Sequence, residues 1–517
     1  MDDLHHRLLQ YFDITEEEFA RISREPSFSA LPKIDEELSA ITAKSRILSA
    51  IEHHEKILVY GDYDTDGIMA TSILIRCFHL LGKAASFFIP SRYVDGYGLN
   101  MANAERIAKK GYSLVILVDN GVGCLQEVSY LLSQGIETII IDHHDLPSVL
   151  PPAVATIHPA LIPYGDYPVS AGYLCFLFAC FLLEKEDEYL LTLGALSTIS
   201  DCMPLYGHNR EIVALALRKI RKYQYKEIIT LAEKTFIDEN VLAMTVIPTI
   251  NAVGRMVEDH RISRVVHYFS DLSEDGKAET AAWMKEINAA RKDATKAAMD
   301  RIRPELELPA ITVIGHLIEG LNGLLANRLL SAYHKPVAVF SAAKTDPSLY
   351  VGSLRSKEGF NVMEFEKSVA PLLVKGGGHA FAGGVSIKKE DYGAFKDAFE
   401  KYAFRHPLAE ENRPMVPILL SEINMEGYRE LRRFGPFGHD YEEPTFLLKD
   451  IPLASLTWNR DGRYLMTELG LGVRIMSFTF PKPSLINFDQ KVSLCGNLRL
   501  EEYRGEVNLV FRAEKAK

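Results

Sequence analysis

One segment organises this chain: Val59-Tyr60-Gly61-Asp62-Tyr63-Asp64-Thr65-Asp66-Gly67. An apolar run over 57–60 leads into it, and apolar residues recur with helical spacing over 68–81. This pattern predicts a buried strand, a tight acidic loop and a helix. Three carboxylates this close repel one another in an enclosed loop, and a divalent cation would relieve that repulsion. The alternative is a solvated turn in which an aspartate caps the helix.

The chain is long and acidic. Its 517 residues are too many for one hydrophobic core, and this length predicts about two to four domains. The formal net charge of -11 argues against a uniformly basic surface for nucleic acid. Local arginine patches and bound cations remain compatible with it, because a contact with nucleic acid needs only a local positive field.

The cysteines and the apolar runs indicate where the protein resides. The six cysteines form no C-x-x-C pair, which favours buried thiols in a reducing compartment over disulfides or zinc. The longest apolar run, 174–183, is too short to cross a bilayer, and the N-terminal residues do not resemble a signal peptide. We therefore expect a soluble, cytoplasmic protein that does not bind membranes.

Residues 46–200 alternate between strand-like and helix-like patterns. Runs of valine, isoleucine and leucine between helices predict the α/β class, with a doubly wound, mostly parallel sheet. In such a sheet, ligands bind beyond the carboxyl ends of the strands. The expected strands span 57–60, 86–89, 114–118, 138–141 and 154–157, and the expected helices span 68–81, 101–110, 122–134 and 171–184.

Acidic residues or histidines follow three of these expected strands. They are the Asp62, Asp64 and Asp66 of the opening segment, Asp119-Asn120-Gly121 after the third strand, and Asp142-His143-His144-Asp145 after the fourth, with Asp201 after a later helix. Each alone has an ordinary explanation as a helix cap or a solvated loop. Because the carboxyl ends of parallel strands meet at one edge, their convergence predicts a metal site.

The ligand types limit the metal. Several carboxylates with one or two imidazoles suit Mn²⁺ or Mg²⁺ better than structural zinc, which takes more thiolates. The acids outnumber the needs of one ion, so we expect two ions about 3.5–4 Å apart. Such a pair holds a phosphoryl group and activates water, and the predicted reaction is phosphodiester hydrolysis.

The middle of the chain is predicted to be helical and then α/β. Residues 205–305 are mainly helical, and a long helix over 273–303 either joins two domains or faces nucleic acid. A second α/β unit follows over 306–405, with a loop at Gly376-Gly377-Gly378-His379. Consecutive glycines let backbone amides approach an anion, so this loop is a candidate phosphate site.

The two ends of the chain differ from its middle. Residues 1–45 are polar and helical, and we expect them to pack on the outside of the domain that follows. After 407 the pattern changes to short strands, which predicts a small OB-like β-barrel that binds single strands by stacking and basic side chains. Its strands are expected near 415–420, 445–448, 452–458, 463–468, 472–479, 490–498 and 506–512. The candidate contacts are Trp458, Arg460, Arg463, Tyr464, Arg474, Phe478 and Phe480, several of which must belong to the core.

Several ordered motifs resemble one known family. They are the GDYDTDG segment at 61–67, the loop from Ser91-Arg92 to Gly96-Tyr97-Gly98-Leu99, Asp142-His143-His144, Ser170-Ala171-Gly172, Asn251-Ala252-Val253-Gly254-Arg255, and the glycine-rich segment 376–384. Together they resemble the DHH phosphoesterase superfamily with its associated DHHA1 domain. Within it, the resemblance extends to the bacterial exonucleases that degrade single-stranded DNA from the 5′ end, and it spans roughly residues 50 to 450.

The resemblance implies roles that spacing alone does not assign. It implies metal ligation by Asp64, Asp66, Asp119, His143 and Asp201, with Asp119 bridging the two ions. His144 would contact the scissile phosphate or help to protonate the leaving oxygen, and Asp62 and Asp142 would orient ligands from in or beside the metal shell. His379 would face the metals across a cleft between domains.

The resemblance also implies how the substrate is held. Arg92, Arg255, Ser353 and Arg355 would bind the 5′-terminal phosphate or the adjacent backbone, with Gly377 and Gly378 in the anion-binding loop. The implied partners are single-stranded DNA with a 5′ end, a single-strand-binding protein and a helicase, and we expect a monomer. One departure lies at Asp440-Tyr441-Glu442, where the family usually has Gly-Asn-Pro.

These inferences define an expected organisation and leave two alternatives open. The expected parts are an N-terminal helical segment (1–45), a DHH catalytic domain (46–205), a helical connector (206–305), a DHHA1 substrate-binding domain (306–407) and an OB-like nucleic-acid-binding domain (408–517). The first alternative is a DHH phosphodiesterase that cleaves short oligoribonucleotides or cyclic dinucleotides in place of long strands. The second is a non-catalytic scaffold that only binds DNA or replication proteins, although such scaffolds have lost the metal-binding acids that this chain retains.

Overall fold

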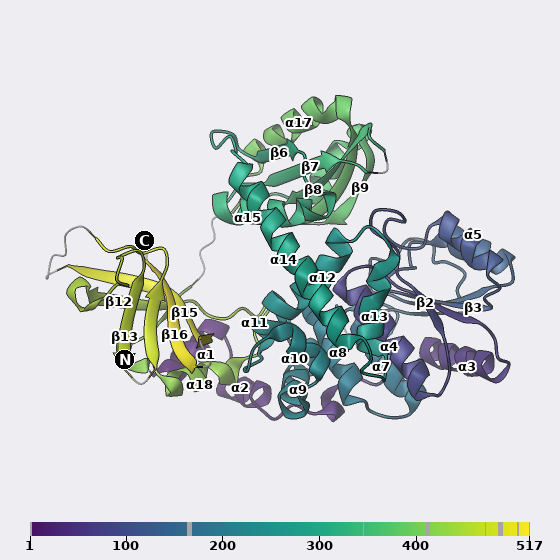
Figure 1. Cartoon of the computed structure of the whole chain (residues 1–517), viewed down its shortest axis with the longest axis horizontal. Coiled ribbons are helices and arrows are strands. Elements are labelled where there is room, and N and C mark those ends of the chain that lie inside the picture. Colours follow the sequence, from purple (N-terminus) through teal and green to yellow (C-terminus); the bar gives the residue numbers. More distant parts are fainter. Residues whose placement is uncertain are drawn as a thin grey trace.

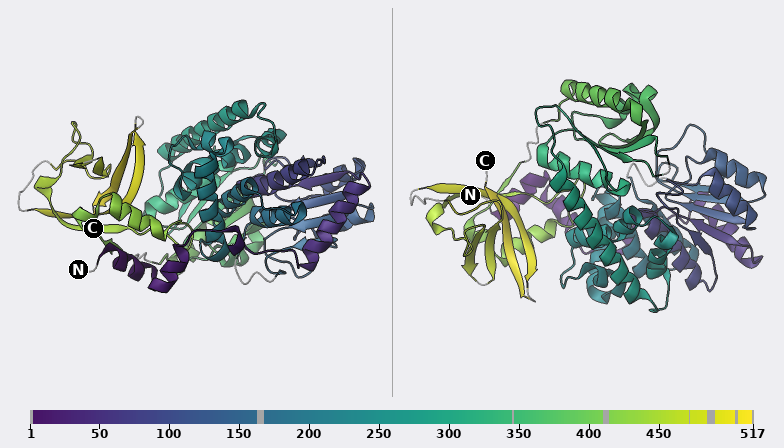
Figure 2. Two further views of the ribbon diagram at one scale, coloured as in Figure 1. Left: turned by 90° about the horizontal axis from the view of Figure 1, so that it is seen from below. Right: turned by 45° about the horizontal axis from the view of Figure 1, so that its top comes forward.

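The protein has three sheets that lie in separate parts of the molecule (Figure 1). The first sheet lies at one end, the third at the opposite end beside both chain termini, and the second above the helices that fill the centre (Figures 1 and 2). This computed structural model describes residues 3–162, 168–344, 346–409, 414–470, 472–483, 490–503 and 506–515. Within the described residues, no helix is both long and apolar enough to span a membrane.

The first sheet is parallel throughout, as the sequence predicts. Its strands are β1 (Ile57–Tyr60), β2 (Ser86–Phe88), β3 (Leu114–Val118), β4 (Glu137–Ile141) and β5 (Ala155–Ile157). Their order is β2-β1-β3-β4-β5, so the direction of winding reverses beside β1. Loops diverge at such a switch point and leave a crevice, and here that crevice lies between the carboxyl ends of β1 and β3.

Helices cover both faces of this sheet. They are α3 (Leu38–Glu52), α4 (Thr65–Leu80), α5 (Met101–Lys109), α6 (Leu125–Ser133), α7 (Ala171–Leu183) and α8 (Glu188–Ser200). The predicted start of α4 at 68 is wrong, because Asp64 caps the helix and accepts a hydrogen bond from the Gly67 amide at 3.2 Å. Asp66 and Gly67 therefore lie in the first turn of the helix, and the acidic loop is shorter than expected.

A group of helices connects the first sheet to the second. They are α9 (Gly207–Tyr223), α10 (Lys226–Ala232), α11 (Glu239–Val241), a π-helical turn η2 (Leu242–Val246), α12 (Ile247–Met256), α13 (Ser263–Ser270) and α14 (Lys277–Arg301). The long helix α14 packs along α12 through a buried hydrogen bond from Asn288 to Thr249 at 2.9 Å. It acts as a connector, since Arg291 is also buried and donates to Asn288 at 3.0 Å.

The second sheet carries the glycine-rich segment. Its strands are β6 (Ile311–Gly315), β7 (Val337–Ala342), β8 (Leu349–Arg355), β9 (Leu373–His379) and β10 (Ala382–Lys388), in the order β6-β7-β8-β10-β9, with helices α15 (Asn322–Tyr333), α16 (Val362–Ser368) and α17 (Tyr392–Arg405). The prediction of a loop at Gly376–Gly378 is wrong, because these residues form the edge strand β9. The glycines permit the carboxyl group of Glu366 to approach the strands closely, since a Cβ on Gly383 would lie 2.2 Å from Glu366 Oε1.

The third sheet is the predicted C-terminal β structure. Its strands are β11 (Val416–Pro417), β12 (Phe446–Pro452), β13 (Leu465–Gly470), β14 (Val473–Ser477), β15 (Lys491–Tyr503) and β16 (Glu506–Lys515), in the order β11-β12-β15-β16-β14-β13, with the helix α18 (Met425–Phe434) beside them. The predicted strand over 452–458 is wrong, because Leu453–Ser455 forms a 3-10 turn. We call β11–β16 and α18 together the C-terminal sheet domain.

The N-terminal helices pack on the C-terminal sheet domain and not on the domain that follows them. Helices α1 (Leu4–Phe12) and α2 (Glu16–Ile22) bury Leu8 and Phe19 in one hydrophobic core with Leu431 and Phe434 of α18. The expectation that residues 1–45 pack on the following domain is therefore wrong for α1 and α2, but it holds for Leu31, Ile34, Ala40 and Ala43, which are buried in the core of the first sheet. The apolar face of α18 needs a cover, and the amphipathic α1 provides it from the far end of the chain.

We predict that Leu8→Ala destabilises the C-terminal sheet domain by about 2–5 kcal/mol, because it leaves a cavity in a core where Leu8 is 0% exposed. Urea unfolding followed by Trp458 fluorescence in a Trp283→Phe background measures this. The control Leu38→Ala, at a position 77% exposed, should change stability by no more than about 0.5 kcal/mol. An unchanged Trp458 transition in Leu8→Ala would contradict this packing.

Candidate metal centre and phosphate site

The structure brings the predicted acids and histidines together at the carboxyl edge of the first sheet. Side-chain oxygens and nitrogens lie within 4.8 Å of one another in three groups: Asp62, Asp64 and Asp119; Asp66, His143 and Asp201; and Asp119, His143 and His144. They come from the ends of β1, β3 and β4, from the start of α4 and from the C-terminus of α8. The parallel-sheet argument therefore predicted their meeting point correctly.

Asp66 is held by the N-terminus of α7. Its carboxylate accepts hydrogen bonds from the amides of Ala171 at 3.0 Å and Gly172 at 2.8 Å, and from the Ser197 hydroxyl at 2.5 Å. A Cβ on Gly172 would lie 2.5 Å from Ser197, so only glycine permits α7, α8 and Asp66 to approach this closely. The Ser170-Ala171-Gly172 motif thus fixes the orientation of one acid of the site.

His143 lies among three of the acids. Its Nε2 is 3.3 Å from Asp119 Oδ1, 3.4 Å from Asp201 Oδ2 and 3.5 Å from Asp66 Oδ2. Burial lowers the pKa of His143, although Asp66, Asp142 and Asp64 act in the opposite direction. A neutral imidazole surrounded by carboxylates is the form that coordinates a divalent cation.

The carboxylates are not balanced by cationic side chains. Burial and then the neighbouring acids raise the pKa values of Asp62 and Asp119 well above the ordinary value, and they raise that of Asp201 to about 8. One buried carboxylate oxygen, Oδ1 of Asp62, has no hydrogen-bond partner among the described residues. Oxygen ligands in excess of their partners suit Mn²⁺ or Mg²⁺, so the residues present fit the predicted cations.

Asp142 differs from the other acids, because it orients His144. Its Oδ1 accepts from the His143 amide at 2.8 Å and lies 2.8 Å from His144 Nδ1, and its Oδ2 accepts from the Val122 amide at 3.1 Å. Burial opposes its ionisation, but the contact with His144 lowers the pKa of Asp142 to about 2. Burial likewise opposes the charge on His144, yet Asp142 raises the pKa of His144 to about 9.

Sequence reasoning missed Tyr97 as a member of this site. Its hydroxyl lies 3.0 Å from His144 Nε2 and 3.2 Å from the carbonyl oxygen of Asp119, to which it can donate. Its side chain is 53% exposed, which leaves the ring open to a substrate beside His144. The sequence feature that could have indicated it is its position in the Gly96-Tyr97-Gly98-Leu99 motif, between two glycines.

Three predicted phosphate-binding arginines converge near the acidic loop. Arg255 ends α12, and its pKa is lowered to about 10 by burial and then by the charge of Arg92, with Arg355 also contributing while Asp64 opposes the shift. The Arg92 guanidinium lies 4.3 Å from the centre of the Tyr63 ring. Like charges held together and partly desolvated favour an anion between them.

The motif around Arg255 is fixed directly to the acidic loop. The Asn251 side-chain oxygen accepts from the Thr65 amide at 2.9 Å and from the Thr65 hydroxyl at 3.0 Å. A Cβ on Gly254 would lie 2.3 Å from the carbonyl oxygen of Tyr63. Asn251 and Gly254 therefore permit the close approach of α12 that places Arg255 beside the acids.

The second sheet presents its polar residues as rows on one face. Ser353 of β8, Gly384 of β10 and Gly377 of β9 are paired across the sheet, and Arg355, Ala382 and His379 form the next row of the same face. A Cβ on Gly377 or Gly384 would meet nothing within 4 Å, so this part of the face is open. Gly378 pairs with Gly383 and lies on the other face, and within the described residues no hydrogen bond or ion pair joins His379 to the acids.

Comparison with known proteins first defines the class. The DHH family, N-terminal domain, matches residues 56–199, the DHHA1 domain matches residues 320–403, and the RecJ OB domain matches residues 416–515. These matches fall on the three sheets in order. The fold and the matches therefore define a protein with a DHH N-terminal domain, a DHHA1 domain and a C-terminal OB domain.

The particular family follows from the relatives. The single-stranded-DNA-specific exonuclease RecJ of Thermus thermophilus is 30% identical over 484 residues, which cover 90% of this chain and 69% of that protein. The RecJ of Bacillus subtilis is 30% identical over 434 residues, and the match spans only 54% of its length and 80% of this chain. The chain belongs to the RecJ family.

Solved structures agree with this assignment. The crystal structure of RecJ in complex with Mn²⁺ from Thermus thermophilus is 25% identical, with a TM-score of 0.83 over 99% of this chain and 76% of that one. A second structure, of the exonuclease RecJ bound to manganese, is 28% identical, with a TM-score of 0.63 over 74% of this chain and 97% of that one. The three-sheet arrangement is thus that of a known fold.

We predict that the metal-free protein loses stability as the pH rises from about 4 to about 8. The raised pKa values of Asp62, Asp119 and Asp201 mean that the folded state keeps protons that the unfolded chain releases above about pH 4. Each retained proton then lowers the free energy of unfolding by up to about 1.4 kcal/mol per pH unit in this window.

Urea unfolding at pH 5 and pH 8, in EDTA and in Mn²⁺, measures this effect. Mn²⁺ should restore the stability that is lost at pH 8, because a bound cation replaces the protons. The comparison variant is Asp119→Asn, since asparagine tolerates the φ of 60° at this position. The variant should show a weaker pH dependence in EDTA and a smaller gain from Mn²⁺, and an equal gain would contradict the assignment of Asp119.

Proposed function

We propose that this protein is a metal-dependent exonuclease that hydrolyses single-stranded DNA from its 5′ end and releases mononucleotides. The observation that carries the proposal is the convergence of buried acids and a cluster of partly buried arginines at the carboxyl edge of the first sheet. The names of the relatives, single-stranded-DNA-specific exonucleases, support the substrate class. The Mn²⁺ in the titles of two similar structures supports the cofactor, for which Mg²⁺ is an equally suitable oxygen-preferring ion.

Five residues would hold two divalent cations. They are Asp64, Asp66, Asp119, His143 and Asp201. When bound, such a pair supplies Lewis acidity toward the phosphate and lowers the pKa of a nucleophilic water. Asp62 lies in the group with Asp64 and Asp119, so it would orient these ligands or complete the shell.

His144 would act on the leaving oxygen. With a pKa of about 9 it carries a proton at neutral pH, and a cationic imidazole can both contact the scissile phosphate and donate that proton. Asp142 holds the ring through Nδ1, which leaves Nε2 as the nitrogen that faces Tyr97 and the site. Asp142 is therefore a positioning residue for the proton donor.

The arginines would set the polarity of digestion. Arg92, Arg255 and Arg355, with Ser353 and the open glycine row of β9 and β10, would hold the 5′-terminal phosphate. Guanidinium groups bind phosphate oxygens in a bidentate manner, so a fixed cluster selects the end of the strand and its orientation. His379, exposed at the end of β9, would contact the substrate from the side of the second sheet.

The C-terminal sheet domain would hold the strand farther from its end. Phe478 is 62% exposed, contacts Tyr464 at 5.2 Å between ring centres and lies under the Arg512 guanidinium at 4.7 Å. This is a stacking surface with a cation beside it. Of the other candidates, Arg460 and Arg463 are exposed, Arg474 pairs with Glu468, Phe480 is buried, and Trp458 donates to the carbonyl oxygen of Phe480 at 3.1 Å.

The proposed partners follow from the substrate. Single strands with a 5′ end arise when a helicase unwinds duplex DNA, and a single-strand-binding protein coats them, so we infer that the protein acts with both in the cytoplasm. We infer a monomer, because all proposed ligands and the phosphate-binding arginines come from one chain. The scaffold alternative is disfavoured, because the acids that it would lack converge here.

Product analysis with 5′-labelled and 3′-labelled strands tests the proposal. We expect a long 5′-phosphorylated single strand to lose mononucleotides from its 5′ end in Mn²⁺ or Mg²⁺, with no reaction in EDTA and little on blunt duplex. Asp119→Asn is the inactive control. Cleavage confined to dinucleotides would support the alternative enzyme, and release from the 3′ end would contradict the proposed role of the arginines.

We predict that Asp142→Asn lowers kcat by about 10²-fold, because His144 loses both its orientation and the charge that raises its pKa. The alkaline limb of the pH–rate profile, set near pH 9 by His144, should also move to lower pH. A purely structural role would lower activity without moving that limb. Asp145→Asn, at the next acid along the loop, is the matched control and should leave the profile unchanged.

A further inference from the structure

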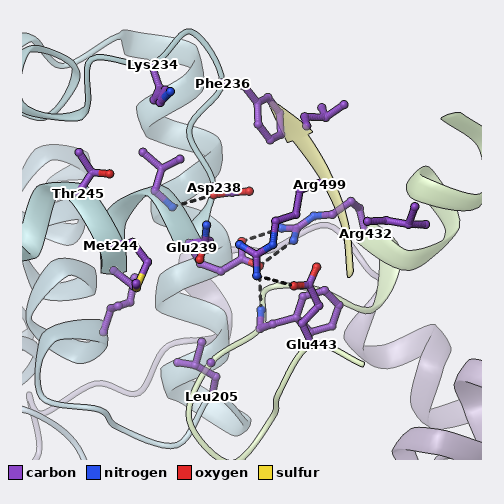
Figure 3. A pocket seen from close by; sticks show the side chains of 18 of the residues that line it. Leu205, Lys234, Phe236, Asp238, Glu239, Met244, Thr245, Arg432, Glu443 and Arg499 are labelled. Carbon is purple, nitrogen blue, oxygen red and sulfur yellow. Dashed lines mark hydrogen bonds and ion pairs between the residues drawn. The ribbon is translucent and has the colours of Figure 1, made fainter. Parts of the chain in front are cut away.

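A cavity of about 610 Å³ separates the C-terminal sheet domain from the central helices (Figure 3). One wall is made by the segment from Lys234 to Thr245, and the other by β15, β16 and α18. Figure 3 shows Glu239, Arg432, Glu443 and Arg499 grouped where the two walls meet. Charged side chains from both parts therefore meet beside the cavity.

The first of these contacts is a buried ion pair. Glu239 of α11 accepts from Arg432 of α18 at 2.8 and 2.6 Å, and also from the amide of Phe437 at 3.0 Å. Glu239 is 4% exposed, and although burial opposes its ionisation, Arg432 keeps the pKa of Glu239 below its ordinary value. A buried charge with three directed hydrogen bonds permits only one relative orientation of the two walls.

The second contact is made by Arg210 of α9. Its guanidinium donates to the carbonyl oxygens of Phe434 at 2.8 Å, Gly435 at 2.6 Å and Pro436 at 3.0 Å, where α18 ends. It also lies 4.8 Å from the centre of the Tyr441 ring, and that ring stacks on Phe12 of α1. A cation suits the carboxyl end of a helix, so Arg210 clamps α18 against the central helices.

The loop that follows α18 also contacts the chain close to the proposed ligand Asp201. The amide of Leu205 donates to the carbonyl oxygen of His439 at 2.9 Å, only four residues after the proposed ligand Asp201. Tyr441 belongs to the segment where this chain departs from the usual family sequence, and it is the residue stacked on Arg210. Tyr441 therefore contributes a contact that joins the C-terminal sheet domain to α9 of the central helices.

We propose that Glu239 and Arg210 are positioning residues that hold the C-terminal sheet domain at one fixed place relative to Asp201. The inference rests on the proposed exonuclease function. A DNA strand that occupies both the stacking surface and the phosphate site then binds more tightly than at either site alone, because the two sites are linked. This gain in affinity depends on a fixed distance and orientation between the two sites. Short strands, which occupy only the metal centre, gain nothing from the clamp.

The test compares Michaelis constants on long and short 5′-phosphorylated strands. The long strand, of about 30 nucleotides, exceeds the roughly 4–16 nucleotides that one OB domain covers, and the short one is a trinucleotide. For Glu239→Ala and Arg210→Ala we expect KM on the long strand to rise about tenfold or more, with kcat and the trinucleotide KM unchanged. The matched control is Glu279→Ala, which removes an exposed ion pair with Arg264 away from the cavity and from the stacking surface.

A charge-reversed double variant distinguishes loss of orientation from misfolding. Glu239→Arg combined with Arg432→Glu should recover most of the long-strand affinity if orientation is what matters, and thermal melting checks that each variant is folded. An unchanged KM for the long strand in folded Glu239→Ala would overturn the proposal. So would an equal loss on both strands, because that would indicate damage to the metal centre itself.

A second measurement separates this proposal from the proposed function. Small-angle X-ray scattering without substrate should show a larger radius of gyration in Glu239→Ala than in the wild type, because released domains sample wider separations. If the wild type cleaves neither strand, the exonuclease proposal fails, while scattering still shows whether the clamp holds the domain. An unchanged radius in both alanine variants would overturn the clamp whatever the enzyme cleaves.

Discussion

The enclosure of several carboxylates at one edge of a parallel sheet is the constraint on which the rest of the structure depends. Burial and the neighbouring carboxylates raise the pKa values of four of them, Asp62, Asp64, Asp119 and Asp201, so the metal-free edge is electrostatically unfavourable. The protein neutralises part of this repulsion through the amides at the start of α7 and the imidazole of His144. Bound cations would neutralise the remaining repulsion. A site with excess carboxylates therefore binds cations well but makes the metal-free protein less stable.

Close backbone approach is what brings distant motifs to that edge. Gly172 permits α7 and α8 to meet around Asp66, and Gly254 permits α12 to lie against the acidic loop. These contacts join segments separated by more than a hundred residues, and each depends on the absence of a side chain. The close approaches at Gly172 and Gly254 therefore bring motifs that are far apart in the sequence together at one edge.

The sequence predicted the first sheet and its acidic edge better than the helix starts, the glycine-rich strand and the packing of the N-terminal helices. Residues such as Asp119 and Asp142 follow strands whose apolar runs are long and uniform, and the rule for parallel sheets then places them together. The start of α4 was missed, because the capping interaction of Asp64 overrides the apolar periodicity. The strand at Gly376–Gly378 was also missed, because glycine has low strand propensity and only pairing with β10 and packing on Glu366 makes it regular. The place of α1 was unpredictable, since nothing local indicates that its apolar face meets α18, more than four hundred residues away.

If the substrate is a polymer, as proposed, the position of the C-terminal sheet domain matters as much as the metal centre. Under the proposed function, the metal centre and the arginines would contact only the end of the strand, which is too little surface to distinguish a long strand from a fragment. Domains joined by small interfaces move relative to one another unless something directional holds them. Glu239 and Arg210 provide directional contacts. Phe12 of α1 also stacks on Tyr441 of the loop after α18, and this noncovalent contact attaches the N-terminal segment to the C-terminal sheet domain. The wrapping of the N-terminus around the C-terminal sheet domain then acquires a functional reason, because it limits the freedom of the surface on which the rest of the strand would lie.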